Sequence, residues 1–178
     1  MKRIVALFLA AVICLGFSAC GGSTELEVGN TFGTDAVELK LISASFGDEY
    51  YVKEQGVIRA PNEGQTFILI SFSLKNIGKT KLDYFPTINN KHTYIPGAII
   101  SVDYNNGYTY SIDDFNINGY CTQSPTLNNL EPLSEAAIYS AYISVPKEVA
   151  ENTDAPLRIN FNLVNAKGRG EVVTYSIR

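Results

Sequence analysis

The sequence contains few of the side chains on which metal, redox and nucleophilic sites depend. It has no tryptophan, one histidine, three cysteines and one methionine in 178 residues. Copper and zinc sites need several His, Cys or Met ligands, so both metals are excluded. The single histidine, His92, lies in the polar stretch NNKHTY, and no Gly-x-Ser-x-Gly motif accompanies it. We therefore predict a protein that is not an enzyme and holds no cofactor, with no catalytic residue and no metal.

Long apolar runs are also absent, except at the start of the chain. Met1-Lys2-Arg3 is followed by 14 residues, from Ile4 to Phe17, that form an apolar run. A permanent transmembrane helix needs about 20 residues, so this run has the proportions of the hydrophobic part of a signal peptide. An ordinary secretory signal cleaved near Cys20 is one interpretation of this leader.

The end of the leader favours a second interpretation. Phe17-Ser18-Ala19-Cys20 resembles a bacterial lipobox, although leucine is usual where Phe17 stands. The resemblance implies a signal peptide over residues 1–19 and a lipid on Cys20, which becomes the mature N-terminus. Stable anchoring needs more than one lipid chain, and a lipidated cysteine of this type resembles that arrangement. We therefore expect attachment to a cell membrane on its extracytoplasmic face.

The charge balance is acidic. Removal of residues 1–19 takes away Lys2 and Arg3, which leaves 12 basic against 18 acidic residues and a net charge of −6. Nucleic-acid binding requires clustered Lys and Arg, so no nucleic acid is expected as a partner. About 159 residues then remain, which suits one domain with its own core.

The cysteine count leaves no pair for an intramolecular disulfide in this mature chain. Cys14 belongs to the leader and Cys20 carries the lipid, so Cys121 stays alone. A single cysteine in an exported protein can be a reactive thiol or an intermolecular partner. A buried apolar role is the simpler interpretation, because no motif links Cys121 to His92.

Alternating patterns predict an all-β domain. Residues 20–35 are rich in Gly, Ser, Thr and acids and are interpreted as the lipidated cysteine with a flexible tether, with a short strand at its end as an alternative. The domain is therefore placed at 36–178. Within it, Asn106-Gly107 predicts a tight hairpin turn. The strands are expected over residues 37–41, 66–76, 98–112 (as a hairpin), 136–145, 157–163 and 171–177. Seven or more short strands without a long amphipathic helix favour an antiparallel β-sandwich.

The order of these segments resembles a known family. GQTFILISFSLKNIGK, a hairpin carrying VDYNNGYTY, LEPLSE and a strand ending ISVPKE follow one another. This order resembles bacterial surface lipoproteins of unknown function with an immunoglobulin-like domain, akin to mycobacterial immunoprotective antigens. The matching segments are Asn76-Ile77-Gly78 and Val145-Pro146, and the resemblance covers about residues 36–177. It implies a fold and a location, and it brings no catalytic residues.

Acidic residues near the hairpin are weak candidates for chemistry. Asp103, Asn105, Asn106, Asp113 and Asp114 could supply oxygen ligands to calcium, but the ordered ligand set of an EF-hand is missing. Turn chemistry explains the asparagines without a metal. Asp113 and Asp114 could also act as the carboxylate pair of a glycosidase, although adjacent residues of a strand point to opposite faces.

Tyrosines are the remaining signal. Tyr104, Tyr108, Tyr110 and Tyr120 lie close together in the sequence around the hairpin. Exposed tyrosines offer apolar area and a hydroxyl to a protein or glycan partner, whereas tyrosines in strands often simply face the core.

Three functional hypotheses follow. The first is a membrane-anchored, non-enzymatic binding module that uses these tyrosines to bind an envelope protein or glycan. The second is a structural spacer or accessory subunit of an envelope complex. The third is a hydrolase of envelope polymers that uses Asp113 or Asp114.

Overall fold

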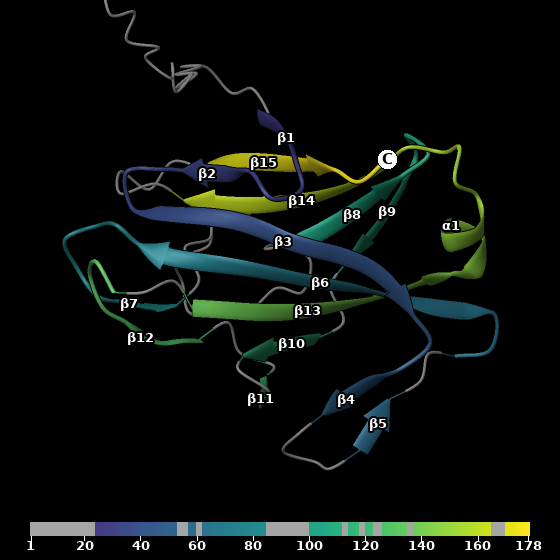
Figure 1. Cartoon of the computed structure of the whole chain (residues 1–178), viewed down its shortest axis with the longest axis horizontal. Coiled ribbons are helices and arrows are strands. Elements are labelled where there is room, and N and C mark those ends of the chain that lie inside the picture. Colours follow the sequence, from purple (N-terminus) through teal and green to yellow (C-terminus); the bar gives the residue numbers. More distant parts are fainter. Residues whose placement is uncertain are drawn as a thin grey trace, which may run out of the picture.

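The protein folds as two β-sheets packed face to face (Figure 1). The computed structural model describes residues 24–52, 57–59, 62–84, 100–111, 114–117, 120–122, 126–134, 137–164 and 170–178. The predicted all-β sandwich is therefore confirmed.

The first sheet has five strands in the order β1-β15-β14-β8-β9. Their bounds are β1 Thr24–Glu27, β8 Ile100–Tyr104, β9 Tyr108–Ser111, β14 Leu157–Val164 and β15 Gly170–Ser176. Its pairs are antiparallel except β1 and β15, which run parallel, with Thr24 beside Val173.

The second sheet has six strands in the order β11-β10-β13-β6-β3-β2, all antiparallel. Their bounds are β2 Thr31–Gly33, β3 Val37–Gly47, β6 Gln65–Asn76, β10 Asp114–Ile117, β11 Tyr120–Thr122 and β13 Ala137–Pro146. Two small ribbons accompany it, formed by β4 Tyr50–Val52 with β5 Val57–Arg59 and by β7 Leu82–Tyr84 with β12 Thr126–Leu130.

The strand order is that of an immunoglobulin-like sandwich. In their order across each sheet, β3, β6, β13 and β10 correspond to the A, B, E and D strands of one sheet, and β15, β14, β8 and β9 to G, F, C and C′ of the other. The expected immunoglobulin-like topology is thus present. Without a disulfide between the B and F strands, the fold depends on its packed side chains.

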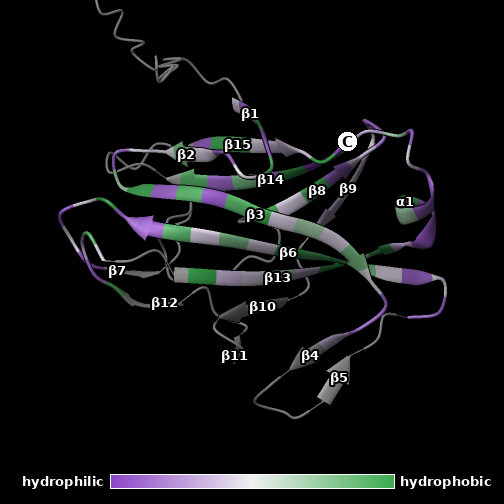
Figure 2. Cartoon of the chain, viewed as in Figure 1, coloured by the Kyte–Doolittle hydropathy of each residue, from purple (hydrophilic) through white to green (hydrophobic). Residues whose placement is uncertain are grey.

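Alternating apolar residues explain which face each strand buries. Figure 2 shows hydrophobic and polar positions alternating along β3 and β6. Ile68, Ile70, Phe72 and Leu74 are buried on β6, as are Leu157, Ile159, Phe161 and Leu163 on β14. Because side chains of a strand point alternately to its two faces, these positions meet between the sheets and form one core.

Asn76 closes one end of the sandwich. Its fully buried side chain donates from Nδ2 to the carbonyls of Leu130 (2.9 Å) and Thr80 (2.8 Å), and its Oδ1 accepts from the Gly78 N–H (2.9 Å). Its own carbonyl accepts from the Leu133 N–H (2.9 Å). Asn76 therefore satisfies three backbone groups with its side chain and a fourth with its carbonyl, and it joins two loops to the end of β6.

The sandwich begins earlier than the predicted boundary at residue 36. Residues 24–27 pair with β15 and residues 31–33 pair with β3. Two strands therefore occupy part of segment 20–35, predicted as a flexible tether with at most one short strand at its end. Residues 1–23, which include the predicted signal peptide and Cys20, lie outside the described residues. Composition alone does not reveal these strands, because Gly, Ser and acidic residues are also tolerated on exposed edge strands.

The other end of the sandwich carries α1 (Lys147–Glu151), the one helix among the residues that the structure describes. The β8–β9 turn and residues 152–156 lie beside it, because Asn105 N–H donates to the Pro156 carbonyl (2.9 Å). We call this region the α1 end. Since β1 runs parallel to β15, whose last residues reach the α1 end, β1 also runs toward that end (Figure 1).

Candidate functional site

The turn between β8 and β9 differs by one residue from the predicted one. Asn105 (φ 50°) and Asn106 (φ 52°) take the left-handed conformation, and the Gly107 N–H bonds to the Tyr104 carbonyl (3.3 Å). This is a type I′ turn centred on Asn105-Asn106, not on Asn106-Gly107. Asparagine tolerates positive φ, so two asparagines could fill both central positions.

Tyr104 is a core residue with a structural partner. Its side chain is only 3% exposed, and its hydroxyl accepts a hydrogen bond from Asn152 Nδ2 (3.0 Å). Asn152 directly follows α1, so Tyr104 fastens the end of the helix to the hairpin. Little of this ring is left for contact with a ligand.

Tyr108 and Tyr110 are more accessible. Tyr108 is 59% exposed, with its ring 6.2 Å from that of Tyr104, and Tyr110 is half-buried against the core. Burial raises the pKa of Tyr110, and the neighbouring Tyr104, Glu148 and Tyr108 raise it further. Both tyrosines share the inward side of the hairpin with Tyr104, because Tyr104 pairs with Tyr108 and Tyr110 pairs with Val102. The three rings therefore form one cluster that faces α1.

Other predicted residues are only partly located. Asp114 lies in β10, and Tyr120 and Cys121 lie in β11, where the backbone alone is described. Cys20, His92 and Asp113 lie outside the described residues. The structure thus brings Tyr104, Tyr108 and Tyr110 together.

A chain of polar side chains crosses the outer face of the first sheet. Asp103 accepts from the Thr109 hydroxyl (2.8 Å) and from Asn160 Nδ2 (2.7 Å), and Asn160 Oδ1 accepts from the Thr174 hydroxyl (2.8 Å). Each carboxylate oxygen of Asp103 therefore already has a protein donor.

Arg158 binds the side chain of Asn106, another candidate calcium ligand. It donates from Nη1 to Asn106 Oδ1 (2.9 Å) and pairs through Nε with Glu25 (3.3 Å). A guanidinium at Asn106 opposes a cation there by charge repulsion. No group of three or more His, Cys, Asp or Glu side chains that could hold a metal ion occurs among the described residues.

Helix α1 is held against the sandwich by several contacts. The Lys147 N–H bonds to the Gly64 carbonyl (3.0 Å), and Val149 is buried in the core. The Arg178 guanidinium donates to the carbonyls of Val149 and Ala155. The helix begins directly after Pro146, and these contacts fix its position.

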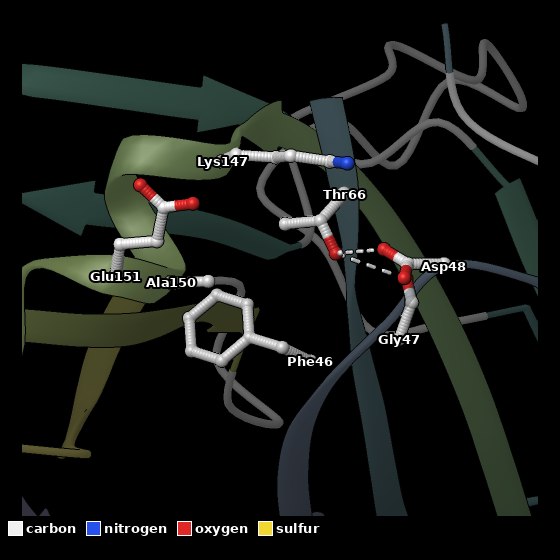
Figure 3. A pocket seen from close by; sticks show the side chains of 7 residues that line it. All are labelled: Phe46, Gly47, Asp48, Thr66, Lys147, Ala150 and Glu151. Atoms are coloured by element: carbon white, nitrogen blue, oxygen red, sulfur yellow. Dashed lines mark hydrogen bonds between the residues drawn. The ribbon is translucent and has the colours of Figure 1, made fainter. Parts of the chain in front are cut away.

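A pocket of about 330 Å³ opens beside α1. Figure 3 shows its walls, which come from the end of β3, the start of β6 and one side of the helix. The residues that line it are Phe46, Gly47, Asp48, Thr66, Lys147, Ala150 and Glu151. This pocket is not predictable from the sequence, because its residues come from three separate segments and no local motif marks them.

None of the helices in the described part of the chain is long and apolar enough to span a bilayer.

Similarity to known proteins is confined to solved structures. No family model matches the chain, and neither does any curated protein sequence. An uncharacterised β-sandwich protein from Clostridium difficile 630 is 20% identical, with a TM-score of 0.62, over 90% of this chain and 98% of that one.

Two Bacillus subtilis structures are more distant. A protein described only provisionally as a lipoprotein, ycdA, is 12% identical with a TM-score of 0.48, over 85% of this chain and 39% of that one. The yjhA protein is 12% identical with a TM-score of 0.46, over 84% of this chain and 98% of that one. The Clostridium difficile structure supports the β-sandwich fold, and the finer resemblance to mycobacterial antigens stays a prediction.

Proposed function

We propose that this protein is a bacterial lipoprotein, anchored through Cys20 on the extracytoplasmic side of a membrane, whose sandwich is a non-enzymatic binding module. Its binding surface is the hairpin patch, defined as Tyr108 and Tyr110 with Tyr104 as their buried support. The partner is an envelope protein.

The direction of β1 is the observation that carries this proposal. β1 begins four residues after Cys20 and runs toward the α1 end. Four residues span at most about 14 Å, so a lipid on Cys20 would hold the domain close to the membrane. The hairpin patch and α1 would then point away from the bilayer, where a partner can reach them.

The chemistry of the patch suits a protein partner. Tyr108 is 59% exposed on a hairpin whose turn has defined backbone geometry, so ordering this tip on binding costs little entropy. Tyrosine is enriched among residues that dominate binding energy at protein interfaces. The net charge of −6 disfavours a nucleic acid or anionic lipid headgroups as the bound molecule.

Membrane anchoring is tested with Cys20→Ser in the source cells. The protein should shift from the membrane fraction to the soluble or secreted fraction, and mass spectrometry of the unsubstituted protein should find a diacylglycerol-modified N-terminal cysteine. Equal membrane association of both proteins would contradict the anchor.

Binding is tested by capture of envelope proteins with the full-length protein in detergent. Tyr108→Ala with Tyr110→Ala should abolish capture of a specific partner. Tyr104→Phe, which keeps the buried ring, is the matched control and should retain it. Circular dichroism confirms that each variant folds. Equal capture by the double variant would refute the hairpin patch.

A further inference from the structure

The pocket beside α1 contains charges for which the described residues supply no ion-pair partner. Lys147 and Glu151 stand four residues apart on α1, a spacing at which side chains of a helix can pair. No ion pair joins them in the described part of the chain. Figure 3 shows the Lys147 side chain extending away from Glu151, toward the side where Thr66 lies. An ammonium and a carboxylate therefore stand on different sides of one opening.

A second carboxylate is fixed at the β-sheet side of the pocket. The buried Thr66 hydroxyl donates to Asp48 Oδ1 (3.3 Å) and to the Gly47 carbonyl (3.1 Å). Among the described residues, the Asp48 carboxylate therefore accepts this one side-chain hydrogen bond, and its oxygens have further capacity to accept.

Apolar groups complete the pocket. Phe46 and Ala150 line it, and the Arg178 guanidinium lies 5.7 Å from the centre of the Phe46 ring. Arg178 also binds carbonyls near α1, so it ties the ring and the helix into one unit. The β-sheet side and the helix side of the pocket are therefore fixed relative to each other.

We propose that this pocket binds a free α-amino acid with a small apolar side chain. Glu151 and Asp48 receive its ammonium group, Lys147 binds its carboxylate, and Phe46 contacts its side chain. A simple cation would leave Lys147 repelled and a simple anion would face two carboxylates, whereas a zwitterion satisfies all three charges. A volume of about 330 Å³ is at the small end of ligand sites, which suits a molecule of this size.

The proposal goes beyond the envelope-binding function and involves none of the hairpin tyrosines. Isothermal titration calorimetry on the full-length protein in detergent tests it with four probes: leucine, glycine, leucinamide and N-acetylleucine. Leucine should bind most tightly, and glycine should bind more weakly because it lacks the side chain for Phe46. Leucinamide lacks the carboxylate and N-acetylleucine lacks the ammonium, so each should bind at least about tenfold more weakly than leucine.

Matched variants assign each charge. Lys147→Met should weaken the binding of leucine at least about tenfold and leave the binding of leucinamide unchanged. Glu151→Gln should weaken the binding of leucine and leave the binding of N-acetylleucine unchanged. Lys40→Met and Glu27→Gln, exposed charges on β3 and β1, should leave leucine binding unchanged. No binding of leucine up to about 10 mM would overturn the proposal. So would equal affinity for leucine and leucinamide, which would indicate a site for simple amines.

Discussion

The ring of Phe72 in one sheet meets the ring of Phe161 in the other, edge to face, with their centroids 5.1 Å apart. Phe72 lies on β6 and Phe161 on β14, the strands that correspond to B and F of an immunoglobulin-like domain. In antibody domains a disulfide joins these strands. Here two fully buried aromatic rings connect the sheets at that position.

Removal of either ring should destabilise the protein strongly. Phe72→Ala or Phe161→Ala should each lower the free energy of unfolding by about 3–5 kcal/mol, because each leaves a cavity in the core. The double variant should lose about 0.5–1.5 kcal/mol less than the sum, which measures the ring contact. Urea unfolding provides these values. A loss below about 1 kcal/mol from both single variants would show that the rings do not join the sheets.

Asn76 should be required for the closed end of the sandwich. Asn76→Ala removes three hydrogen bonds and leaves buried backbone groups without partners. It should therefore lower the free energy of unfolding by about 2–5 kcal/mol. Asn162→Ala, at a half-buried position on the outer side of β14, is the control and should cost about 1 kcal/mol or less. Similar losses from the two variants would argue against the network.

The buried hydroxyl of Tyr139 should destabilise the protein. This buried residue of β13 has no hydrogen-bond partner for its hydroxyl in the described part of the chain. Tyr139→Phe keeps the ring, which stacks on Phe72, and should raise the free energy of unfolding by about 1 kcal/mol. A decrease measured by urea unfolding would reveal a partner for this hydroxyl.

Stability should fall in strongly alkaline solution. Burial raises the pKa of Tyr139 and that of Tyr175 to about 12. The unfolded chain releases these protons near pH 10 and the folded chain near pH 12, so these groups leave the free energy of unfolding unchanged below pH 10 and lower it as pH rises toward 12. Each tyrosine should contribute a slope of up to about 1.4 kcal/mol per pH unit. Urea unfolding between pH 9 and 11.5 should show a smaller slope for Tyr139→Phe than for the unsubstituted protein; identical slopes would contradict this.

The turn after β12 stores backbone strain. Leu133 has φ 57° at the third position of the turn Glu131–Ser134, where glycine is favoured. Its side chain is exposed, so Leu133→Gly should raise the free energy of unfolding by up to about 1 kcal/mol, after the greater freedom of glycine in the unfolded chain is included. Leu133→Val should lower it. Thermal unfolding that ranks valine above glycine would refute strain at this position.

Strong alternation made the central strands predictable from sequence. Residues 66–76 and 157–163 correspond closely to β6 and β14, and the alternating apolar positions of both strands are buried. Over residues 20–35 the sequence indicates at most one short strand, near the end where β2 lies, and β1 is not predicted, because strands of four and three residues at sheet edges show little alternation. Their pairing depends on partners that are distant in sequence, Val173 for Thr24 and Leu39 for Phe32.

The candidate sites were less predictable than the fold. Periodicity indicates which side chains share a strand face, but it does not distinguish the buried Tyr104 from the exposed Tyr108, because both point to the same side of their hairpin. Tyr104 is more buried than Tyr108 because Asn152 and α1 lie over it on that side of the hairpin. The pocket could not be predicted, because it forms only where β3, β6 and α1 come together in the folded protein.

The most direct test of the central claim is site-specific photo-crosslinking in intact source cells. A photoreactive amino acid replaces Tyr108 in the full-length protein, and in a second strain it replaces Lys40, which is exposed on the second sheet. The account predicts a defined cross-link to one envelope protein from position 108, none from position 40, and its loss when Cys20→Ser releases the chain from the membrane. Identical cross-links from both positions, or none from position 108, would contradict a membrane-anchored module that binds through its hairpin patch.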